Sequence, residues 1–150
     1  MSLDYDLKIE TSLDPRQILE IVAKANGIEA IDTTEPYSFQ MTGASVVAMP
    51  IENDIGKRLI LEGYGFVPNL LVSFEYHISE PIDNIAHGVS AILREVPGNA
   101  VLLWNGEETI AKRINGKLEV QLERYEWLLK EFDLAGLKYE RCELESPLIA

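Results

Sequence analysis

The stretch from Ala100 to Leu122, AVLLWNGEETIAKRINGKLEVQL, holds three apolar-rich runs separated by two Asn-Gly dipeptides, Asn105-Gly106 and Asn115-Gly116. Asn-Gly suits a type I′ turn because both residues tolerate a positive φ, and the twist of that turn matches the flanking strands. The stretch therefore predicts a three-stranded antiparallel meander. Its first run, Val101 to Trp104, is almost continuously apolar, so we expect that strand to be covered on both faces.

Further strands and helices are predicted on both sides of the meander. Residues 3–10 alternate between apolar and charged side chains, which is typical of a half-buried strand. Asp14, Pro15 and Gln17 form the start signal of a helix that ends at Gly27. Apolar residues share one helical stripe in a second helix, which starts at Ser79 to Pro81 and stops at Pro97-Gly98, and a third helix is predicted over 124–132.

The remaining segments carry weaker patterns. Strands are predicted over 28–31, 44–49, 59–64, 70–78 and 137–144, a loop with room for a short edge strand over 33–43, and a polar turn over 52–57. Gly63 and Gly65 are interpreted as a bend in the strand that contains them. The fold class that follows is α+β: a single domain over 1–150 with a mostly antiparallel sheet of about six to eight strands and three helices packed mainly on one face.

Composition narrows the functional classes. The 150 residues are 47% hydrophobic, enough for one globular domain, and carry a formal net charge of −12. This charge argues against nucleic-acid binding, which needs a basic face, and permits fast association with a basic protein. No apolar run is long enough to cross a membrane, and a single cysteine without a secretory signal predicts a cytoplasmic protein.

Residues that carry chemistry are few and isolated. Cys142, His77 and His87 lie in no recognisable motif, and neither a metal-ligand spacing nor a complete phosphate-binding glycine loop is present. Carboxylates are plentiful, but the sequence singles out no acid–base pair. We therefore expect no catalytic residue, no metal and no cofactor.

One resemblance adds a functional expectation. The residues that carry it are Gly65-Phe66-Val67-Pro68, Val72-Ser73-Phe74 and the run from Pro97 to Glu107, PGNAVLLWNGE, together with the opening Leu3 to Leu7. In these residues and in the order of its elements, the chain resembles the Sit-type immunity proteins of bacteria. The resemblance implies a cytoplasmic protein that binds and neutralises a partner toxin, and it brings no catalytic motif.

The surface hypothesis that follows concerns Trp104, Asn105, Glu107 and Glu108, where an aromatic side chain that can anchor a partner stands beside carboxylates that can steer it. The competing interpretation places Trp104 in the core and leaves the two glutamates to solvate a turn. Two other functions stay open. One is a small-molecule-binding or regulatory domain with a pocket between sheet and helices, and the other is an enzyme that uses carboxylates. The sequence does not specify the oligomeric state.

Overall fold

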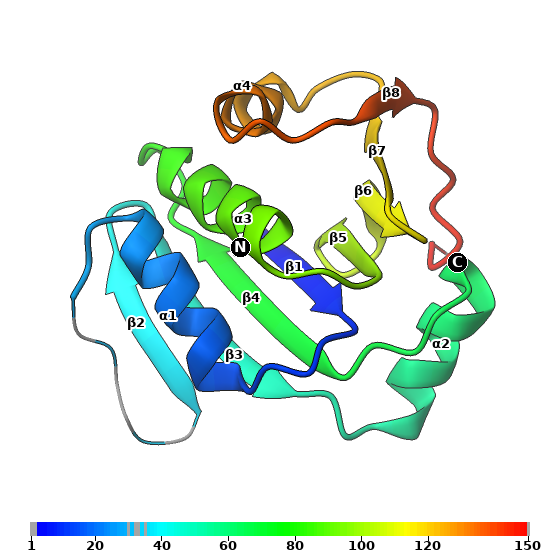
Figure 1. Ribbon diagram of the computed structural model, residues 1–150, viewed down its shortest axis with the longest axis horizontal. Helices are drawn as coiled ribbons and strands as arrows, with labels where there is room; N and C mark the ends of the chain where they lie inside the picture. Colours follow the sequence, from blue (N-terminus) through cyan, green and yellow to red (C-terminus); the bar gives the residue numbers. More distant parts are fainter. Residues whose placement is uncertain (1–2, 30, 32–33, 35, 150) are drawn as a thin grey trace.

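A computed structural model describes residues 3–29, 31, 34 and 36–149. It shows one eight-stranded sheet in the order β2-β3-β4-β1-β5-β6-β7-β8, with helices against it (Figure 1). The strands are β1 (Leu3–Ile9), β2 (Tyr37–Met41), β3 (Ala44–Pro50), β4 (Leu70–Tyr76), β5 (Ala100–Trp104), β6 (Glu108–Ile114), β7 (Lys117–Gln121) and β8 (Glu140–Cys142). The helices are α1 (Pro15–Ala25), α2 (Asp54–Tyr64), α3 (Asp83–Glu95) and α4 (Glu126–Leu134).

The predicted fold class is confirmed, with four helices in the described residues rather than three. Neighbouring strands pair antiparallel except β7 and β8, which are parallel. β1 lies inside the sheet, where Leu7 is opposite Val72 of β4 on one side and Leu102 of β5 on the other. β1, the first strand of the chain, therefore lies between two groups of strands: β4, β3 and β2 on one side, and the meander on the other.

The meander is confirmed as β5, β6 and β7. Asn105 and Gly106 have φ of 50° and 75°, and Asn115 and Gly116 have φ of 52° and 84°, as type I′ turns require. β5 is also buried on both faces, because Leu102 belongs to the main core while Val101 and Leu103 belong to a second one. A bulge interrupts the pairing of β5 with β6 between Leu102 and Leu103.

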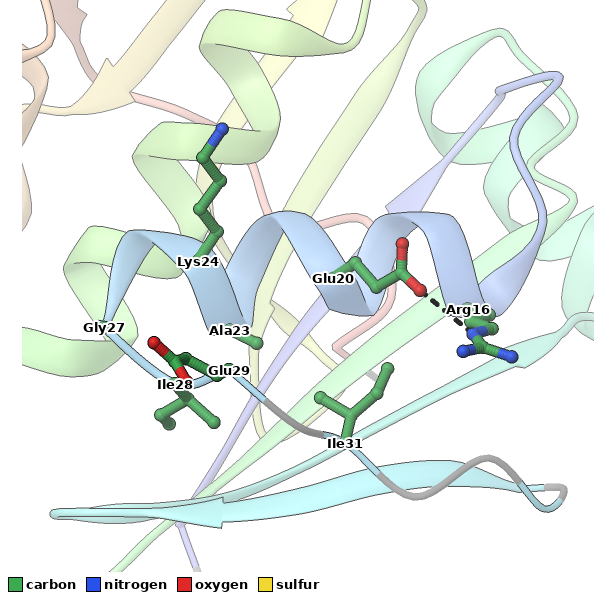
Figure 2. Close-up of a pocket in the computed structure, with 8 residues that line it drawn as sticks. All are labelled: Arg16, Glu20, Ala23, Lys24, Gly27, Ile28, Glu29 and Ile31. Carbon is green, nitrogen blue, oxygen red and sulfur yellow. Dashed lines mark hydrogen bonds and ion pairs between the residues drawn. The ribbon is translucent and has the colours of Figure 1, made fainter.

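The start of α1 is confirmed as well. The Asp14 side chain accepts a hydrogen bond from the Gln17 amide at 2.8 Å, and the Gln17 side chain accepts one from the Asp14 amide at 2.9 Å. On the solvent side of α1, Arg16 and Glu20 form an ion pair at 2.9 Å (Figure 2). The opposite side buries Ile18, Leu19 and Val22 in the main core, and α1 packs against α3 over the sheet (Figure 1).

Residues 52–64 differ from the prediction of a polar turn followed by a strand. Residues 54–64 form α2, and Asn53 caps its N-terminus. The Asn53 side chain accepts a hydrogen bond from the Ile55 amide at 2.8 Å, and Gly65, with φ of 84°, ends the helix in the left-handed conformation. Gly65 therefore serves a helix end rather than a bend in a strand.

α2 packs on the face of the sheet opposite the main core. Its buried side chains, Ile60 and Tyr64, are four residues apart and meet Val101 and Leu103 of β5 in the second core. Gly63 faces the C-terminal segment, because a Cβ atom there would lie 2.9 Å from the Pro147 side chain. The sheet thus has a large core under α1, α3 and α4, and a small one under α2.

Smaller differences concern strand limits. Ile28, Glu29 and Ile31 lie outside any strand, and Ala30 lies outside the described residues. The short edge strand for which the segment 33–43 left room is present as β2, at one edge of the sheet. β4 ends at Tyr76, two residues before the predicted limit of that strand, and Ile78 is 56% exposed. The strand predicted over 137–144 is reduced to β8.

The apolar stripe of α3 supports a stability prediction. Leu93→Ala should lower the free energy of unfolding by about 2–5 kcal/mol, because Leu93 is buried in the main core and its truncation leaves a cavity there. Urea denaturation of the variant and the parent measures the difference. A change near zero would show that Leu93 does not pack as described.

Candidate functional site

The turn between β5 and β6 brings together all four residues of the surface hypothesis. Trp104 is the last residue of β5 and pairs with Glu108, the first residue of β6. Asn105 and Glu107 occupy the tip and are exposed, and the Glu107 amide donates to the Trp104 carbonyl at 3.1 Å. The four residues therefore form one contiguous structure, but their side chains have different surroundings.

Asn105 fastens this turn to β1. Its backbone amide donates to the Asp4 carbonyl at 2.7 Å, and its side-chain oxygen accepts from the Asp4 amide at 2.9 Å. The side chain thus extends the pairing of β1 with β5 by one residue, and its carbonyl oxygen is already engaged. Through these two hydrogen bonds Asn105 holds the turn against β1, next to Asp4.

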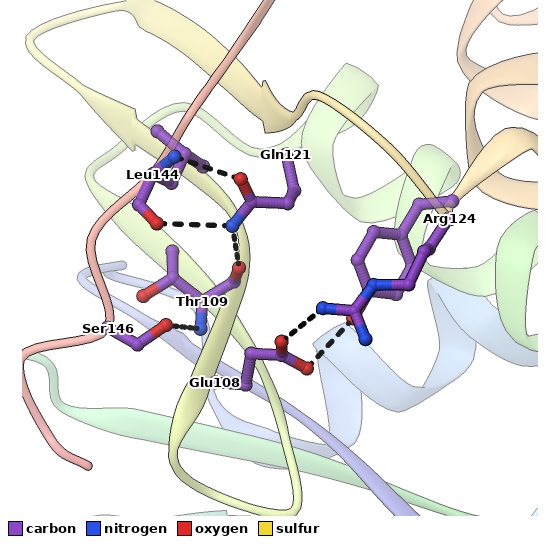
Figure 3. A network of polar contacts seen from close by, with 7 residues as sticks. Glu108, Thr109, Gln121, Arg124, Leu144 and Ser146 are labelled. Atoms are coloured by element: carbon purple, nitrogen blue, oxygen red, sulfur yellow. Dashed lines mark hydrogen bonds and ion pairs between the residues drawn. The ribbon is translucent and has the colours of Figure 1, made fainter.

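Glu108 is held by two side chains from the segment that precedes α4. Arg124 Nη2 lies 2.6 Å from one carboxylate oxygen, and the Tyr125 hydroxyl donates to the other at 3.2 Å (Figure 3). The Glu108 side chain is 19% exposed. Burial and the adjacent charge of Glu108 raise the pKa of Tyr125, so its hydroxyl stays protonated as a donor at neutral pH.

Figure 3 also shows how the C-terminal segment is tied to the bulge in β6. The Thr109 amide donates to Ser146 Oγ at 3.0 Å, and Gln121 Nε2 donates to the Thr109 carbonyl at 3.1 Å. Gln121 Oε1 also accepts a hydrogen bond from the Leu144 amide at 2.9 Å. On the second core, the Thr109 hydroxyl meets the Tyr64 hydroxyl of α2. This network fixes the strand that follows the turn.

Trp104 stands at the margin of an aromatic cluster. It lies opposite Tyr5 in the sheet, and Tyr5 makes edge contacts with Tyr76 at 6.4 Å and Trp127 at 5.4 Å between ring centroids. Tyr125 contacts Trp127 at 6.3 Å. Tyr5 and Tyr125 are buried, whereas Tyr76, Trp104 and Trp127 are half-buried and pack on the main core. Trp104 is thus both a core-edge residue and part of a partly exposed aromatic surface.

We call this region the turn-end surface: Tyr76, Trp104, Asn105, Glu107, Glu108 and Trp127. The sequence indicated its turn residues but not Tyr76, Trp127 or the partners Arg124 and Tyr125. Strand register and the docking of α4 bring those residues in, and neither is written in the local pattern. Half-buried aromatic side chains with polar residues at their margin are typical of protein-binding surfaces.

A groove of about 660 Å³ lies beside α1 (Figure 2). It is lined by Arg16, Glu20, Ala23 and Lys24 of α1 and by Gly27, Ile28, Glu29 and Ile31. Two of its charged groups, Arg16 and Glu20, pair with each other, and Lys24 points away from Glu29 and Ile31. Its polar groups therefore do not converge on a common point, as they do in a ligand site.

The histidines and the cysteine have structural partners. His77 Nε2 lies 3.1 Å from Ser45 Oγ, and His87 lies 3.3 Å from a Glu131 carboxylate oxygen. The Cys142 thiol donates to Glu119 at 3.2 Å. Within the described part of the chain, no group of three or more His, Cys, Asp or Glu side chains is placed to hold a metal ion.

Comparison with known proteins gives one match. The SitI3-like family matches residues 3–130, which is most of the chain. The chain belongs to the SitI3-like family. The matched span runs from β1 into α4 and includes the whole turn-end surface, whereas β8 and the C-terminal segment bound to Thr109 lie beyond it. The resemblance to Sit-type immunity proteins is therefore confirmed at the level of the family.

Two wider comparisons found nothing: no curated protein and no solved structure matches this SitI3-like chain. Its described helices include none with the length and apolar character needed to span a membrane.

Proposed function

We propose that this SitI3-like protein is an immunity protein that neutralises a cognate toxin by binding it, without catalysis. Family membership over residues 3–130 is the observation that carries the proposal. Two further observations support it. The turn-end surface has half-buried aromatic anchors beside the carboxylate of Glu108, which Arg124 and Tyr125 hold in place, and the net charge of −12 favours association with a basic protein.

The proposal places the protein in the cytoplasm, beside the target that the toxin would attack. It includes neither nucleic acid nor a membrane as partner, because the charge opposes contact with phosphates. In the complex, Trp104 and Trp127 would anchor the toxin, Glu107 would steer it, and Glu108 would accept hydrogen bonds in a position set by Arg124 and Tyr125. Asn105 would act by holding the turn.

Co-expression tests the proposal. We expect a toxin-like reading frame next to this gene. Its product should kill bacterial cells when expressed alone and leave them viable when this protein is present. The two proteins should also elute together from a sizing column. If the toxin remains lethal beside abundant folded protein and no complex forms, the immunity role is excluded. The alternative of a small-molecule-binding or regulatory domain would then be favoured.

The two glutamates of the turn should respond differently to charge reversal. Glu107→Lys should slow association with the toxin several-fold and leave the melting temperature unchanged, because Glu107 is exposed. Glu108→Lys should also destabilise the fold by about 1–2 kcal/mol, because it places a cation beside Arg124 and removes the acceptor of Tyr125.

Association kinetics at two salt concentrations and thermal melts of both variants provide the measurements. Screening acts over about 8 Å at 0.15 M salt, so the difference between Glu107→Lys and the parent should shrink as salt rises. Equal association rates for Glu107→Lys and the parent at low salt would remove Glu107 from the surface.

A further inference from the structure

Four neighbouring strands of the sheet are covered on one face only. In β1, β3 and β4, buried side chains alternate with partly exposed ones, and β2 follows the same pattern at lower contrast. A second covering layer would bury both sets, as it does in β5, whose residues Ala100 to Leu103 are all buried. α2 provides that layer over β5 through Ile60 and Tyr64. The other face of β2, β3, β4 and β1, which we call the outer face, has no such cover among the described residues.

Strand register places specific side chains in rows across the outer face. Ser45 lies opposite Glu75, which lies opposite Asp4, and in the next row Val47 lies opposite Ser73, which lies opposite Asp6. All six are at least partly exposed. Leu71, which is partly exposed, lies in the row after that, opposite Lys8. The outer face therefore has carboxylates along β1 and β4 and apolar side chains at Val47 and Leu71.

The carboxylates of this face are not neutralised by close partners. Within the described residues, Asp4, Asp6 and Glu75 form no ion pair, since the salt bridges present involve other acids. Lys8, two positions from Asp6 on the same face of β1, is the cation whose charge acts on Asp6. Three carboxylates against one nearby lysine leave the face negative, and this favours contact with a basic surface.

Asp6 is the most constrained of the three carboxylates. Its Oδ1 accepts the Ser73 hydroxyl at 2.6 Å, and a Cβ atom on Gly106 would lie 3.8 Å from its Oδ2. Burial raises its pKa and the charge of Asp4 adds to this, while the Ser73 hydrogen bond opposes it. The ionised side chain thus costs folding free energy at neutral pH, and a cation from a partner would remove that cost.

The outer face is continuous with the turn-end surface. Asp4 belongs to the first and is bonded through its backbone to Asn105 of the second, and Gly106 of the turn stands beside Asp6. A partner that contacts the turn therefore reaches the acidic margin without a gap. A second copy of this chain fits poorly, because it would bring another net charge of −12 against the same carboxylates.

We propose that the outer face is the docking site for a basic face of the toxin, whose Lys or Arg side chains pair with Asp4, Asp6 and Glu75 while apolar side chains cover Val47 and Leu71. This rests on the proposed immunity function and adds the location and the chemistry of the contact. It also assigns Asp6 a role in binding the toxin, in addition to its hydrogen bond with Ser73.

Asp6→Asn separates binding from stability. The amide oxygen of Asn can still accept a hydrogen bond from the Ser73 hydroxyl, and the variant loses the partly buried charge. We expect its melting temperature to rise by about 2–4 °C and its affinity for the toxin to fall at least about tenfold. A variant that melts higher and binds as tightly as the parent would overturn the role of Asp6.

The double variant Asp4→Lys/Glu75→Lys tests the face as a whole. Its matched control is Asp83→Lys/Glu95→Lys on α3, which changes the net charge equally at two exposed positions on the helical side of the molecule. We expect the first variant to lose at least about a hundredfold in affinity and the control less than about fivefold. Equal losses would show that only overall charge matters, and would reject the face while leaving the immunity function intact.

A probe other than the toxin keeps the two proposals apart. Titration of the isotope-labelled protein with a ten-residue lysine peptide at low salt should shift backbone amides of β1, β3 and β4 more than those of α1 and α3. Shifts spread evenly would reject the outer face even if neutralisation is observed. Focused shifts with no neutralisation would retain a basic-partner face and reject immunity. A dimer in sedimentation that Asp4→Lys/Glu75→Lys dissociates would assign the face to a second copy instead.

Discussion

Gly98→Ala should lower the free energy of unfolding by at least about 4 kcal/mol. Gly98 has φ of 125°, and a Cβ atom on its backbone would lie 2.1 Å from the carbonyl oxygen of Glu10. The obstacle is main chain rather than a flexible side chain, because the turn before β5 lies against the end of β1, where the Glu10 amide donates to the Asn99 carbonyl at 2.9 Å. The added methyl group must displace one of the two segments.

Gly116→Ala is the matched control. Gly116 also has a positive φ, 84°, but nothing lies within 4 Å of a Cβ atom there. Its cost should be about 1 kcal/mol, which is the conformational part alone. Chemical denaturation of both variants measures the difference. Similar losses in the two variants would mean that the approach of Gly98 to Glu10 is not as close as described.

Arg113→Met should cost about 3–5 kcal/mol, because it removes a buried charge from the carbonyl groups that surround it. Arg113 is 9% exposed, and its guanidinium donates to Leu93 and Val96 at the end of α3 and to Gly98 at 2.9 Å. Carbonyl groups at a helix C-terminus carry partial negative charge and otherwise lack partners. Burial lowers the pKa of Arg113, but a guanidinium remains charged at neutral pH.

Two controls define what Arg113 contributes. Arg16→Met removes the same charge from an exposed ion pair with Glu20 and should change stability by less than about 0.5 kcal/mol. Arg113→Lys keeps the charge but cannot reach three acceptors in one plane, so it should recover only part of the loss. Stability of Arg113→Met equal to the parent would show that water satisfies these carbonyl groups.

Local signals in the sequence predicted the elements whose limits are set by neighbouring residues. Both Asn-Gly turns and the capping box at Asp14 depend on a few consecutive residues, and all are confirmed. α2 was missed although its signals were present: Asn53 caps it, Ile60 and Tyr64 share one side, and Gly65 ends it. Gly63 and Gly65 were interpreted as a bend in a strand. The segment is a helix instead, and its packing on β5 is a tertiary contact that the local sequence does not show.

Features that depend on residues far apart in the sequence were beyond such signals. The position of β1 between β4 and β5 follows from register, and so does the meeting of Tyr5 with Trp104. Trp104, Asn105, Glu107 and Glu108 were expected at one turn and lie there, but the partners of Glu108 come from the start of α4. A pattern of apolar and polar positions gives no distance between such segments.

The internal position of β1 has a consequence for how the chain reaches its native state. Its two neighbours in the sheet are supplied by residues 70–76 and 100–104, so both of its edges stay unpaired until more than half of the polypeptide is available. Contacts of such long sequence separation slow folding, typically to milliseconds or seconds. For the proposed immunity role, a molecule still being synthesised offers no protection. The standing pool of folded protein, rather than the rate of new synthesis, would then set how much toxin a cell survives.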